Sequence, residues 1–243
     1  MQPYASLTPD LVDELRAIVG AKHLIYDAPD RMQDYAHDEV ADPQYAHMPE
    51  AVVKPDSADQ IAAIMRLANR ERVPVTPRGA GSGLSGGAVP VYGGILLSLE
   101  RMNRILEIDR QNLVVVVEPG VVTNDINEAV QEFGLFYAGY PMSVETCFIG
   151  GNVAENAGGG RAIKYGVTGQ YVLGLEVVLP TGEIIQLGGK RVKDVTGYDV
   201  LHLMVGSEGT LGIFTRITLR LRPLPTARIV LLIPFADVPS AIA

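Results

Sequence analysis

The apolar residues in the first hundred positions follow the two periods that separate helices from strands. Residues 9–19 and 58–68 carry apolar side chains every three to four positions, which predicts two amphipathic helices. Both have start signals, with Thr8 before the first helix and a capping box from Ser57 to Gln60 before the second. Continuous apolar runs predict buried strands at 51–53, 73–76 and 94–99. Strand, helix and strand in this order indicate a parallel βαβ unit.

The later part of the chain favours antiparallel pairing. Residues 105–108 and 113–117 are two apolar runs so close in sequence that we expect a hairpin. A second hairpin joins 175–179 to 183–187 through a turn of Pro, Thr and Gly. Residues 213–221 alternate between apolar and polar, which is typical of a strand with one buried face.

Helices are fewer in this part of the chain. Thr123 is predicted to cap a helix that Gly134 stops, and Asp199 is predicted to cap a short one. Residues 138–170 are rich in Gly, Asn and Ser and show little regular pattern. A stretch of that length without secondary structure is usually functional.

The end of the chain carries a new apolar run. Residues 228–235 predict a further strand, and Asp237 is predicted to cap one helical turn. A single strand and a single turn cannot bury their apolar side chains by themselves. We therefore expect the chain to stop inside a second domain.

Composition and charge narrow the class of protein. The chain has 243 residues, of which 47% are hydrophobic, enough for one large domain or two small ones. Its net charge of −8 argues against nucleic acid as the main partner. The single cysteine, Cys147, excludes an internal disulfide and fits a reducing compartment. No signal peptide or long apolar run is present, so we expect a cytoplasmic protein, either free or held at a membrane through partners.

The stretch 77–87, with the sequence PRGAGSGLSGG, is the strongest chemical signal. Glycines let the backbone take positive φ and approach a ligand, and successive bare N–H groups form a nest for anions. Residues 81–86 also match the dinucleotide fingerprint GxGxxG. That fingerprint requires a helix directly after the loop, and the Gly and Pro residues of 86–94 exclude one. The loop is therefore predicted to hold a phosphate or pyrophosphate through its own amides.

Glycines gather in three places, at 79–94, 150–160 and 206–212, which suggests three close approaches of the backbone. Histidines, in contrast, are scattered. They are His23, His37, His47 and His202, and none has metal-site spacing. We predict no metal site in this chain.

Four motifs occur in a fixed order, and each alone is a weak signal. They are Pro77–Gly87, Phe148–Gly159, Lys193–Asp199 and Val205–Ile213. Together they resemble the PCMH-type FAD-binding domain of the FAD-linked oxidases, the vanillyl-alcohol-oxidase superfamily. The likeness is closest to the branch of glycolate oxidase catalytic subunits and FAD-dependent D-lactate dehydrogenases, and it covers roughly residues 40–225.

The resemblance implies an α+β fold built of two α/β subdomains with FAD between them. A small parallel βαβ subdomain would span 51–108, and a mixed subdomain with an antiparallel sheet would span 109–225. Residues 1–50 would form a helical and irregular segment. Residues 226–243 would begin a truncated substrate or cap domain.

The resemblance also assigns the cofactor residues. Amides of the first loop would hold the pyrophosphate, the second motif would border the flavin ring, and the last would hold the adenosine end. In that order the residues are Arg78, Gly79, Ala80, Gly81, Ser82, Gly83 and Leu84; then Pro141, Ser143, Gly150, Gly151, Asn152, Asn156, Ala157 and Gly158; and then Glu208, Gly209 and Ile213. Catalytic groups of the relatives lie in later segments, so we expect them beyond Ala243.

The implied function is that of a D-2-hydroxy-acid dehydrogenase or oxidase of the glycolate or D-lactate class. Hydride would pass from the α-carbon of a small anionic substrate to the flavin, and electrons would leave to a quinone, a partner protein or oxygen. One alternative is a non-catalytic FAD-carrying electron-transfer subunit of a glycolate oxidase-like complex. Another is a member that uses FAD without net redox, as in ether-lipid synthesis. Both a homo-oligomer and a multi-subunit complex fit the sequence.

Some members of the superfamily attach FAD covalently through a histidine or a cysteine. Arg78 stands near the predicted cradle where a histidine would be needed, so we predict non-covalent FAD. Cys147 is interpreted as a small buried core thiol rather than a flavin link. Arg161, Lys164 and the run 190–193 are either carboxylate-attracting groups or solvated surface charge, and the second interpretation is favoured.

Overall fold

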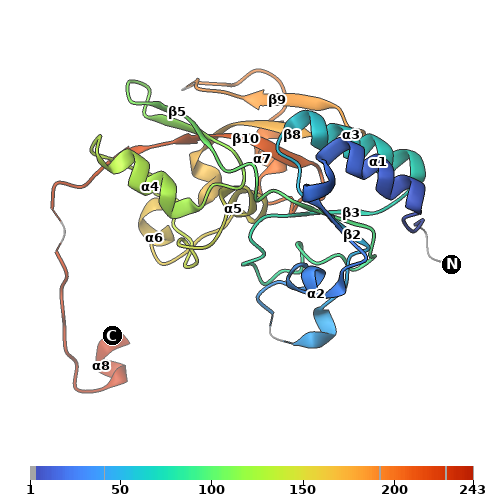
Figure 1. Cartoon of the computed structure of the whole chain (residues 1–243). Coiled ribbons are helices and arrows are strands. Elements are labelled where there is room, and N and C mark those ends of the chain that lie inside the picture. The colour runs from blue at the N-terminus through green and yellow to red at the C-terminus, as the bar shows by residue number, and fades with distance from the viewer. Residues whose placement is uncertain (1–3, 41, 192, 228, 243) are drawn as a thin grey trace.

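The computed structural model describes residues 4–40, 42–191, 193–227 and 229–242 (Figure 1). Its strands are β1 (Leu24–Tyr26), β2 (Ala51–Val53), β3 (Val75–Arg78), β4 (Ile95–Ser98), β5 (Ile105–Asp109), β6 (Val114–Val117), β7 (Leu135–Phe136), β8 (Val172–Val178), β9 (Ile184–Gly188), β10 (Ile213–Arg220) and β11 (Arg222–Pro223). Its α-helices are α1 (Pro9–Val19), α2 (Pro29–Met32), α3 (Ala58–Glu71), α4 (Thr123–Gln131), α5 (Ile149–Glu155), α6 (Ala162–Tyr165), α7 (Val200–Met204) and α8 (Val238–Ile242). Short 3-10 helices are η1 (Ala21–His23), η2 (Gln33–Tyr35), η3 (Pro43–Tyr45) and η4 (Thr168–Tyr171).

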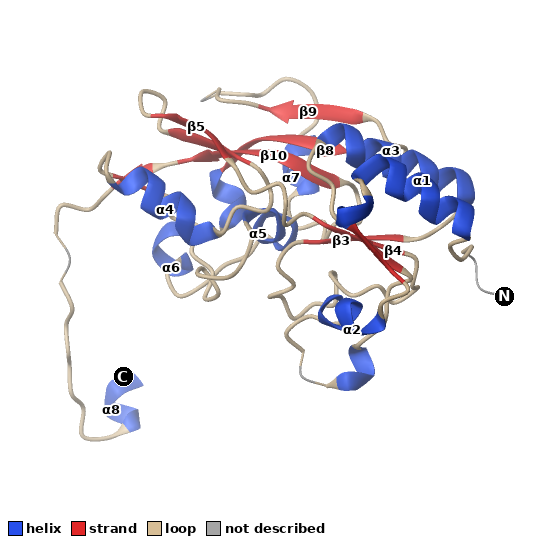
Figure 2. Ribbon diagram, in the orientation of Figure 1, coloured by secondary structure: helices blue, strands red, loops and turns tan. Residues whose placement is uncertain are grey.

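The smaller sheet confirms the predicted βαβ unit. Its strand order is β1-β2-β4-β3, with β2 and β3 both parallel to β4. The helix between them, α3, begins as expected, because the Ser57 hydroxyl accepts a hydrogen bond from the Gln60 amide. Helices α1 and α3 lie side by side along this sheet, and their apolar faces share one core with it (Figure 2). The antiparallel edge strand β1 lies in the segment that the sequence pattern left irregular.

The larger sheet has the order β5-β6-β10-β8-β9 and is antiparallel throughout. Both predicted hairpins form, β5 with β6 and β8 with β9. Strand β10 lies at the centre of the sheet and alternates as expected, except that Phe214 is buried as well. A register shift lies between Phe214 and Arg216, and the buried Thr215 at this point donates through its hydroxyl to Glu176 at 2.8 Å. Parallel and antiparallel sheets with packed helices make this an α+β fold.

Three local predictions are wrong. Thr123 does not cap α4 but is its first residue, after the N-cap Val122. Its fully buried hydroxyl instead donates to the Cys147 carbonyl and accepts from Asn152 at 2.6 Å. Residues 138–170 are not without structure, since they hold α5, α6 and η4. Residues 229–235 form no strand in the described part of the tail, and their apolar side chains are exposed.

The tail confirms one detail of the prediction. Asp237 caps α8, because its carboxylate accepts from the Ser240 amide at 2.8 Å. Figure 1 shows the tail leaving the two sheets and ending in α8, apart from the rest of the molecule. Nothing in the described chain therefore packs against its apolar residues.

The chain changes sheet between Ser98 and Ile105. Strand β5 pairs with β6, with Ile105 opposite Val117, and so belongs to the larger sheet. The boundary predicted after residue 108 would place β5 in the smaller subdomain. The strand pairing favours a boundary several residues earlier, at the end of β4.

Candidate functional site

The first wall of the site is the glycine loop, residues 79–88, which leaves the carboxyl end of β3. The amides of residues 79–85 donate no hydrogen bond to any residue that the structure describes. The next amide, that of Gly86, donates to the Asp38 carboxylate at 2.9 Å. Since backbone N–H groups are strong donors that seek a partner, seven consecutive free ones make a site for an anionic acceptor.

The second wall is helix α5, which contains two of the predicted flavin-ring glycines. Gly150 packs on Pro119, where an added Cβ would lie 2.6 Å from the proline Cβ. Gly151 faces open space instead, since an added Cβ there would meet no atom within 4 Å. The two walls approach each other at Gly79, where a Cβ would lie 3.7 Å from the Gly151 nitrogen.

The third glycine cluster, residues 206–212, joins both walls. The Gly206 amide donates to the Val153 carbonyl at 3.0 Å and the Glu208 amide donates to the Ala154 carbonyl at 2.9 Å. Glu208 takes a positive φ of 53° to do so. On the other side, a Cβ on Gly87 would lie 3.6 Å from the Glu208 carbonyl oxygen. The three glycine clusters of the sequence therefore meet at one place.

Three adjoining cavities run along this junction. The first, of about 200 Å³, lies between the glycine loop and α5. The second, of about 70 Å³, shares Gly79 and Gly151 with the first and reaches Glu208 and Ile213. The third, of about 390 Å³, shares Gly209 and Ile213 with the second and continues beneath α3. The row of cavities is long, with free amides at one end and a largely apolar lining at the other.

Most of the residues predicted to bind the cofactor line these cavities. The first or second cavity is lined by Arg78, Gly79, Ala80, Gly81, Ser82, Gly83, Pro141, Ser143, Gly150, Gly151, Asn152, Ala157, Glu208, Gly209 and Ile213. Leu84, Asn156 and Gly158 line none of the three. Leu84 is exposed, the Asn156 side chain accepts from the Gly169 amide at 2.9 Å, and a Cβ on Gly158 would press on Val167. Whether each predicted residue touches the cofactor stays a prediction.

Two acids of the first cavity were missed by the sequence analysis. Asp38 lies in the N-terminal segment and is buried, with its carboxylate accepting from the Gly86 and Val40 amides. Glu155 lies one turn after Gly151 on α5 and accepts from the Ser85 hydroxyl at 2.9 Å, so it links the two walls. Recognising α5 in the sequence would have indicated Glu155, because residues four apart share a helix face. No sequence signal indicated Asp38.

Arg78 takes part in the site in an unexpected way. Its side chain is buried and turns toward the N-terminal segment. The guanidinium donates to the carbonyls of His37 at 2.7 Å, Asp34 at 3.0 Å and Ala88 at 3.3 Å. Burial lowers its pKa from the usual value, although Tyr35 and three nearby acids counteract this.

A polar network adjoins Arg78 at the carboxyl ends of the small sheet. Glu100 accepts from Lys54 at 2.6 Å and from the hydroxyls of Tyr35 and Ser98 at 3.0 Å. Burial would raise the pKa of Glu100, but these hydrogen bonds and the Lys54 charge lower it overall. Burial likewise would lower the pKa of Lys54, but its bonds to Glu100 and Tyr35 raise it overall. The network therefore favours the charged forms of both groups.

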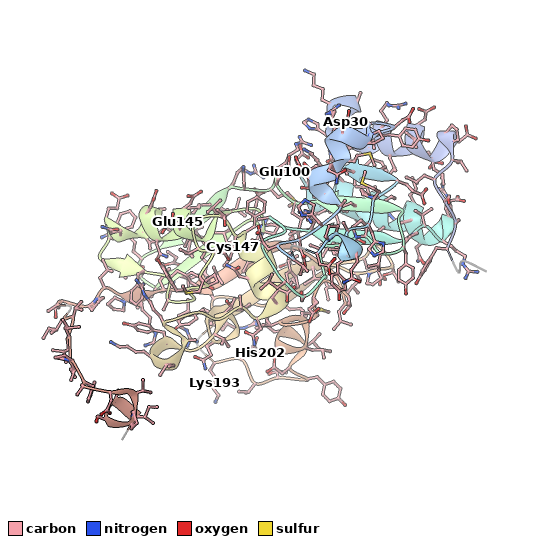
Figure 3. The ribbon with its side chains drawn as sticks, turned by 90° about the horizontal axis from the view of Figure 1, so that it is seen from below. Asp30, Glu100, Glu145, Cys147, Lys193 and His202 are labelled. Carbon is pink, nitrogen blue, oxygen red and sulfur yellow. The ribbon has the colours of Figure 1, made fainter. Side chains whose placement is uncertain are left out.

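Cys147 is a buried thiol, as the sequence predicts. Cys147 is buried in the cavity wall, with its sulfur 3.4 Å from the Thr123 hydroxyl. In the view of Figure 3, Cys147 lies near the middle of the molecule, whereas Lys193 and His202 lie at one edge. None of the four histidines lines the three cavities, and the described residues contain no cluster of three potential metal ligands. No described helix is long and apolar enough to cross a membrane.

The basic residues considered for a carboxylate have other neighbours. Lys190 pairs with Glu107 and Asp109, and Arg191 pairs with Asp194 at 2.6 Å. Arg161 lies over the ring of Tyr140, 4.0 Å from its centroid. Arg161 thereby contacts a residue next to the first cavity, since Tyr140 precedes Pro141.

Comparison with known proteins gives one matching family. The family described as FAD binding domain matches residues 49–188. The chain is 46% identical to the glycolate oxidase subunit GlcD of Bacillus subtilis, over 97% of the chain and 49% of that protein. It is 43% identical to a D-lactate dehydrogenase of Anaerostipes hadrus, over 99% of the chain and 50% of that protein. The chain thus spans about half the length of these relatives.

Solved structures give the same fold. An alkyldihydroxyacetonephosphate synthase superposes with a TM-score of 0.79 at 25% identity, over 93% of the chain and 42% of that protein. The 4-ethylphenol oxidase of Gulosibacter chungangensis superposes with a TM-score of 0.75 at 26% identity, over 90% and 43% respectively. These likenesses confirm the predicted PCMH-type α+β fold.

Proposed function

The chain belongs to the FAD binding domain family and binds FAD, and from this premise we propose that its polypeptide oxidises a small D-2-hydroxy acid. The relatives above are a glycolate oxidase subunit and a D-lactate dehydrogenase, and a D-2-hydroxyglutarate dehydrogenase of Stutzerimonas stutzeri is 38% identical over 90% of the chain and 46% of that protein. All three names denote oxidation of a 2-hydroxy acid. The structural observation that supports the proposal most is the row of free amides at 79–85.

FAD fits the row of cavities by shape and by donor chemistry. A dinucleotide is long, as the row is, and its diphosphate needs several donors at one point. The free amides of the glycine loop would hold the diphosphate. The flat ring would lie against Gly151, where the missing side chain leaves room, and the adenosine end would lie toward Gly209 and Ile213. This is the arrangement that the motifs predicted.

The residues of this chain would bind and shield the cofactor rather than move protons. When bound, FAD supplies the acceptor for a hydride from the substrate α-carbon. Pro141, Ser143 and Gly151 would form the wall against the ring and exclude water from one face. Asn152 is held by its bond to Thr123, so its position in that wall is fixed. The base that takes the hydroxyl proton would come from the remainder of the polypeptide.

The experiment that tests the proposal uses the full polypeptide purified with FAD. Glycolate, D-lactate and D-2-hydroxyglutarate are each added without oxygen, and the visible flavin absorption is followed. We expect bleaching by at least one of them and none by L-lactate or L-2-hydroxyglutarate. A holoprotein that no hydroxy acid bleaches would contradict the proposal.

An electron-transfer subunit is the second candidate. The observation that favours it is that none of the histidines His23, His37, His47 and His202 lines the three adjoining cavities along the glycine clusters. Such a subunit would exchange electrons with a reduced partner protein and leave hydroxy acids untouched. The same bleaching experiment separates the two functions, with dithionite as a control that the flavin is reducible.

Non-covalent attachment is part of the proposal. Arg78 occupies the loop position near which a histidine link would be needed, and Cys147 is almost fully buried in the cavity wall. We expect flavin fluorescence to separate from the polypeptide on denaturation and gel filtration. Flavin that stays with the denatured chain, and that moves away from it in Cys147→Ser, would show a thioether instead.

The wider context is proposed from the same family likeness. The substrate is a small anionic hydroxy acid, and the electron acceptor is a quinone, a partner protein or oxygen. The polypeptide would act in the cytoplasm or at a membrane through a partner, as a homo-oligomer or a complex. Residues 226–243 would begin its substrate or cap domain, after the FAD-binding domain of 51–225 and the N-terminal segment 1–50.

A further inference from the structure

The N-terminal segment 34–39, here called the clamp segment, lies against the glycine loop although it precedes the residues that match the family. Hydrogen bonds join the two segments, and each segment donates one of them. The Glu39 amide donates to the Gly83 carbonyl at 3.1 Å, and the Gly86 amide donates to Asp38 at 2.9 Å. The loop is thus held at two points by a segment far from it in sequence.

Arg78 makes a third connection between the clamp segment and the glycine loop. Its guanidinium bonds the carbonyls of Asp34 and His37 in the clamp segment and that of Ala88 at the far end of the loop. It also contacts the middle of the loop, because a Cβ on Gly81 would lie 2.1 Å from its Nη2. A planar group with several fixed donors suits such a junction of carbonyls.

The clamp segment is itself fixed to the sheet. The Tyr35 hydroxyl donates to Glu100 at 3.0 Å, and Glu100 is held by Lys54. The ring of Tyr35 lies beneath Arg78, 5.9 Å from the guanidinium carbon to the ring centroid. Free amides cannot hold their own loop in shape, since they make no internal bonds. The shape of residues 79–85 therefore depends on outside contacts, which are the Ser85–Glu155 bond and those of the clamp segment and Arg78.

We propose that Arg78 is a positioning residue for FAD, whose guanidinium fixes the glycine loop against the clamp segment so that the free amides converge on the diphosphate. The proposal rests on the proposed cofactor site. It differs from a role as counter-charge, because every bond of the guanidinium is to a carbonyl and the acids Asp34, Asp38 and Glu39 lie near it. Geometry rather than charge is what Arg78 supplies.

Arg78→Lys and Arg78→Met separate geometry from charge. Lysine keeps the positive charge, but one ammonium group cannot bridge the three carbonyls as the guanidinium does. We expect both variants of the full polypeptide to raise the FAD dissociation constant at least about tenfold, which equals about 1.4 kcal/mol. An Arg78→Lys variant that binds FAD within about twofold of the wild type would overturn the proposal, because charge alone would then suffice.

Arg66→Met is the matched control. Arg66 also donates to a backbone carbonyl, that of Gly182 at 2.8 Å, but lies away from the glycine loop. We expect it to lower the melting temperature of the FAD-free protein without changing FAD affinity. If Arg66→Met weakens FAD as much as the Arg78 variants do, a general loss of stability explains both and the proposal falls.

Hydrogen exchange on the wild type covers the case in which neither Arg78 variant folds. The clamp predicts that FAD slows amide exchange at residues 79–85 and also at Glu39 and Val40, whose bonds tighten with the loop. Slowing confined to 79–85 would contradict it. If the wild type bound no FAD, the proposed cofactor site itself would be wrong. If the wild type bound FAD and Arg78→Lys bound it equally well, only the proposed role of Arg78 would be wrong.

Discussion

The two walls of the FAD cleft are both rich in glycine, yet they are held in place by different forces. The wall of α5 is fixed by close packing, since Gly150 lies directly on Pro119, and the segment after the helix packs in the same way, with Gly159 on the Tyr140 carbonyl. The glycine loop is fixed by polar contacts from Arg78 and Asp38. Gly150 has no room for a side chain in the protein, whereas an added Cβ on Gly83 or Gly86 of the loop would meet no atom within 4 Å.

The difference shows that a run of glycines in a sequence has no single meaning. Gly150 and Gly151 are neighbours, but a Cβ on the first would overlap Pro119 and a Cβ on the second would meet nothing. Conformation does not separate them, because neither has a positive φ. The neighbours of the missing Cβ decide whether a glycine serves packing or binding. Substitutions at the two positions should therefore behave in opposite ways.

The largest effect is expected from Gly150→Ala. The new methyl group would lie 2.6 Å from the Pro119 Cβ and 3.0 Å from its carbonyl oxygen, so the helix or the proline turn must move. Overpacking of this kind costs about 3 kcal/mol in the free energy of unfolding. Thermal denaturation of the FAD-free protein measures it. A melting temperature within about 2 °C of the wild type would show that the two segments can separate at little cost.

Gly151→Ala is expected to leave stability unharmed and to weaken FAD binding. Alanine favours a helix over glycine by up to about 1 kcal/mol, so the FAD-free protein should melt at the same temperature or slightly higher. The methyl group would point into the cleft, and we expect a dissociation constant for FAD about tenfold higher, or about 1.4 kcal/mol. Fluorescence titration measures the constant. Unchanged affinity with raised stability would mean that the cofactor does not lie against Gly151.

Much of the fold follows from the sequence because periodicity and turn residues are local signals. The capping box of α3, the two hairpins and the alternation of β10 all depend on residues near one another in the chain. Helix α5 was missed because its sequence, IGGNVAE, has two glycines in its first turn, and glycine is a poor helix former. Packing on Pro119 and the bond from Gly150 to its carbonyl stabilise this helix from outside.

The candidate site, like the fold, could be predicted only in part. The glycine loop could be recognised from its composition, and the family motifs placed the other two clusters. Asp38 and the side-chain role of Arg78 could not be predicted, because the bonds that define them join residues about forty positions or more apart. The apolar run at 229–235 was a strand by pattern, but a strand needs a partner, and no described segment pairs with it.

The smallest effect concerns pH and the polar support of the glycine loop. Glu100 has a folded pKa below its ordinary value, because its bonds to Lys54, Ser98 and Tyr35 outweigh burial. A lowered pKa contributes stability above the unfolded value of about 4.3, and this is lost as pH falls through the folded value. The group is partly exposed, so the contribution at neutral pH should stay below about 1 kcal/mol.

The variant Glu100→Gln tests whether the Glu100 charge stabilises the protein, in comparison with the α5 wall, which is held by packing. We expect the wild type to be more stable than the variant at about pH 7 and the difference to shrink as the pH falls below the unfolded value of about 4.3, because the carboxylate then becomes protonated in both states. Asp109→Asn in the larger sheet is the comparison, since the pKa of Asp109 is about 2 and its contribution should persist further into acid. Gly150→Ala should show a pH-independent loss, because packing carries no proton. A Glu100→Gln difference that stays constant with pH would mean that shape rather than charge supports the loop, and would assign both walls to packing.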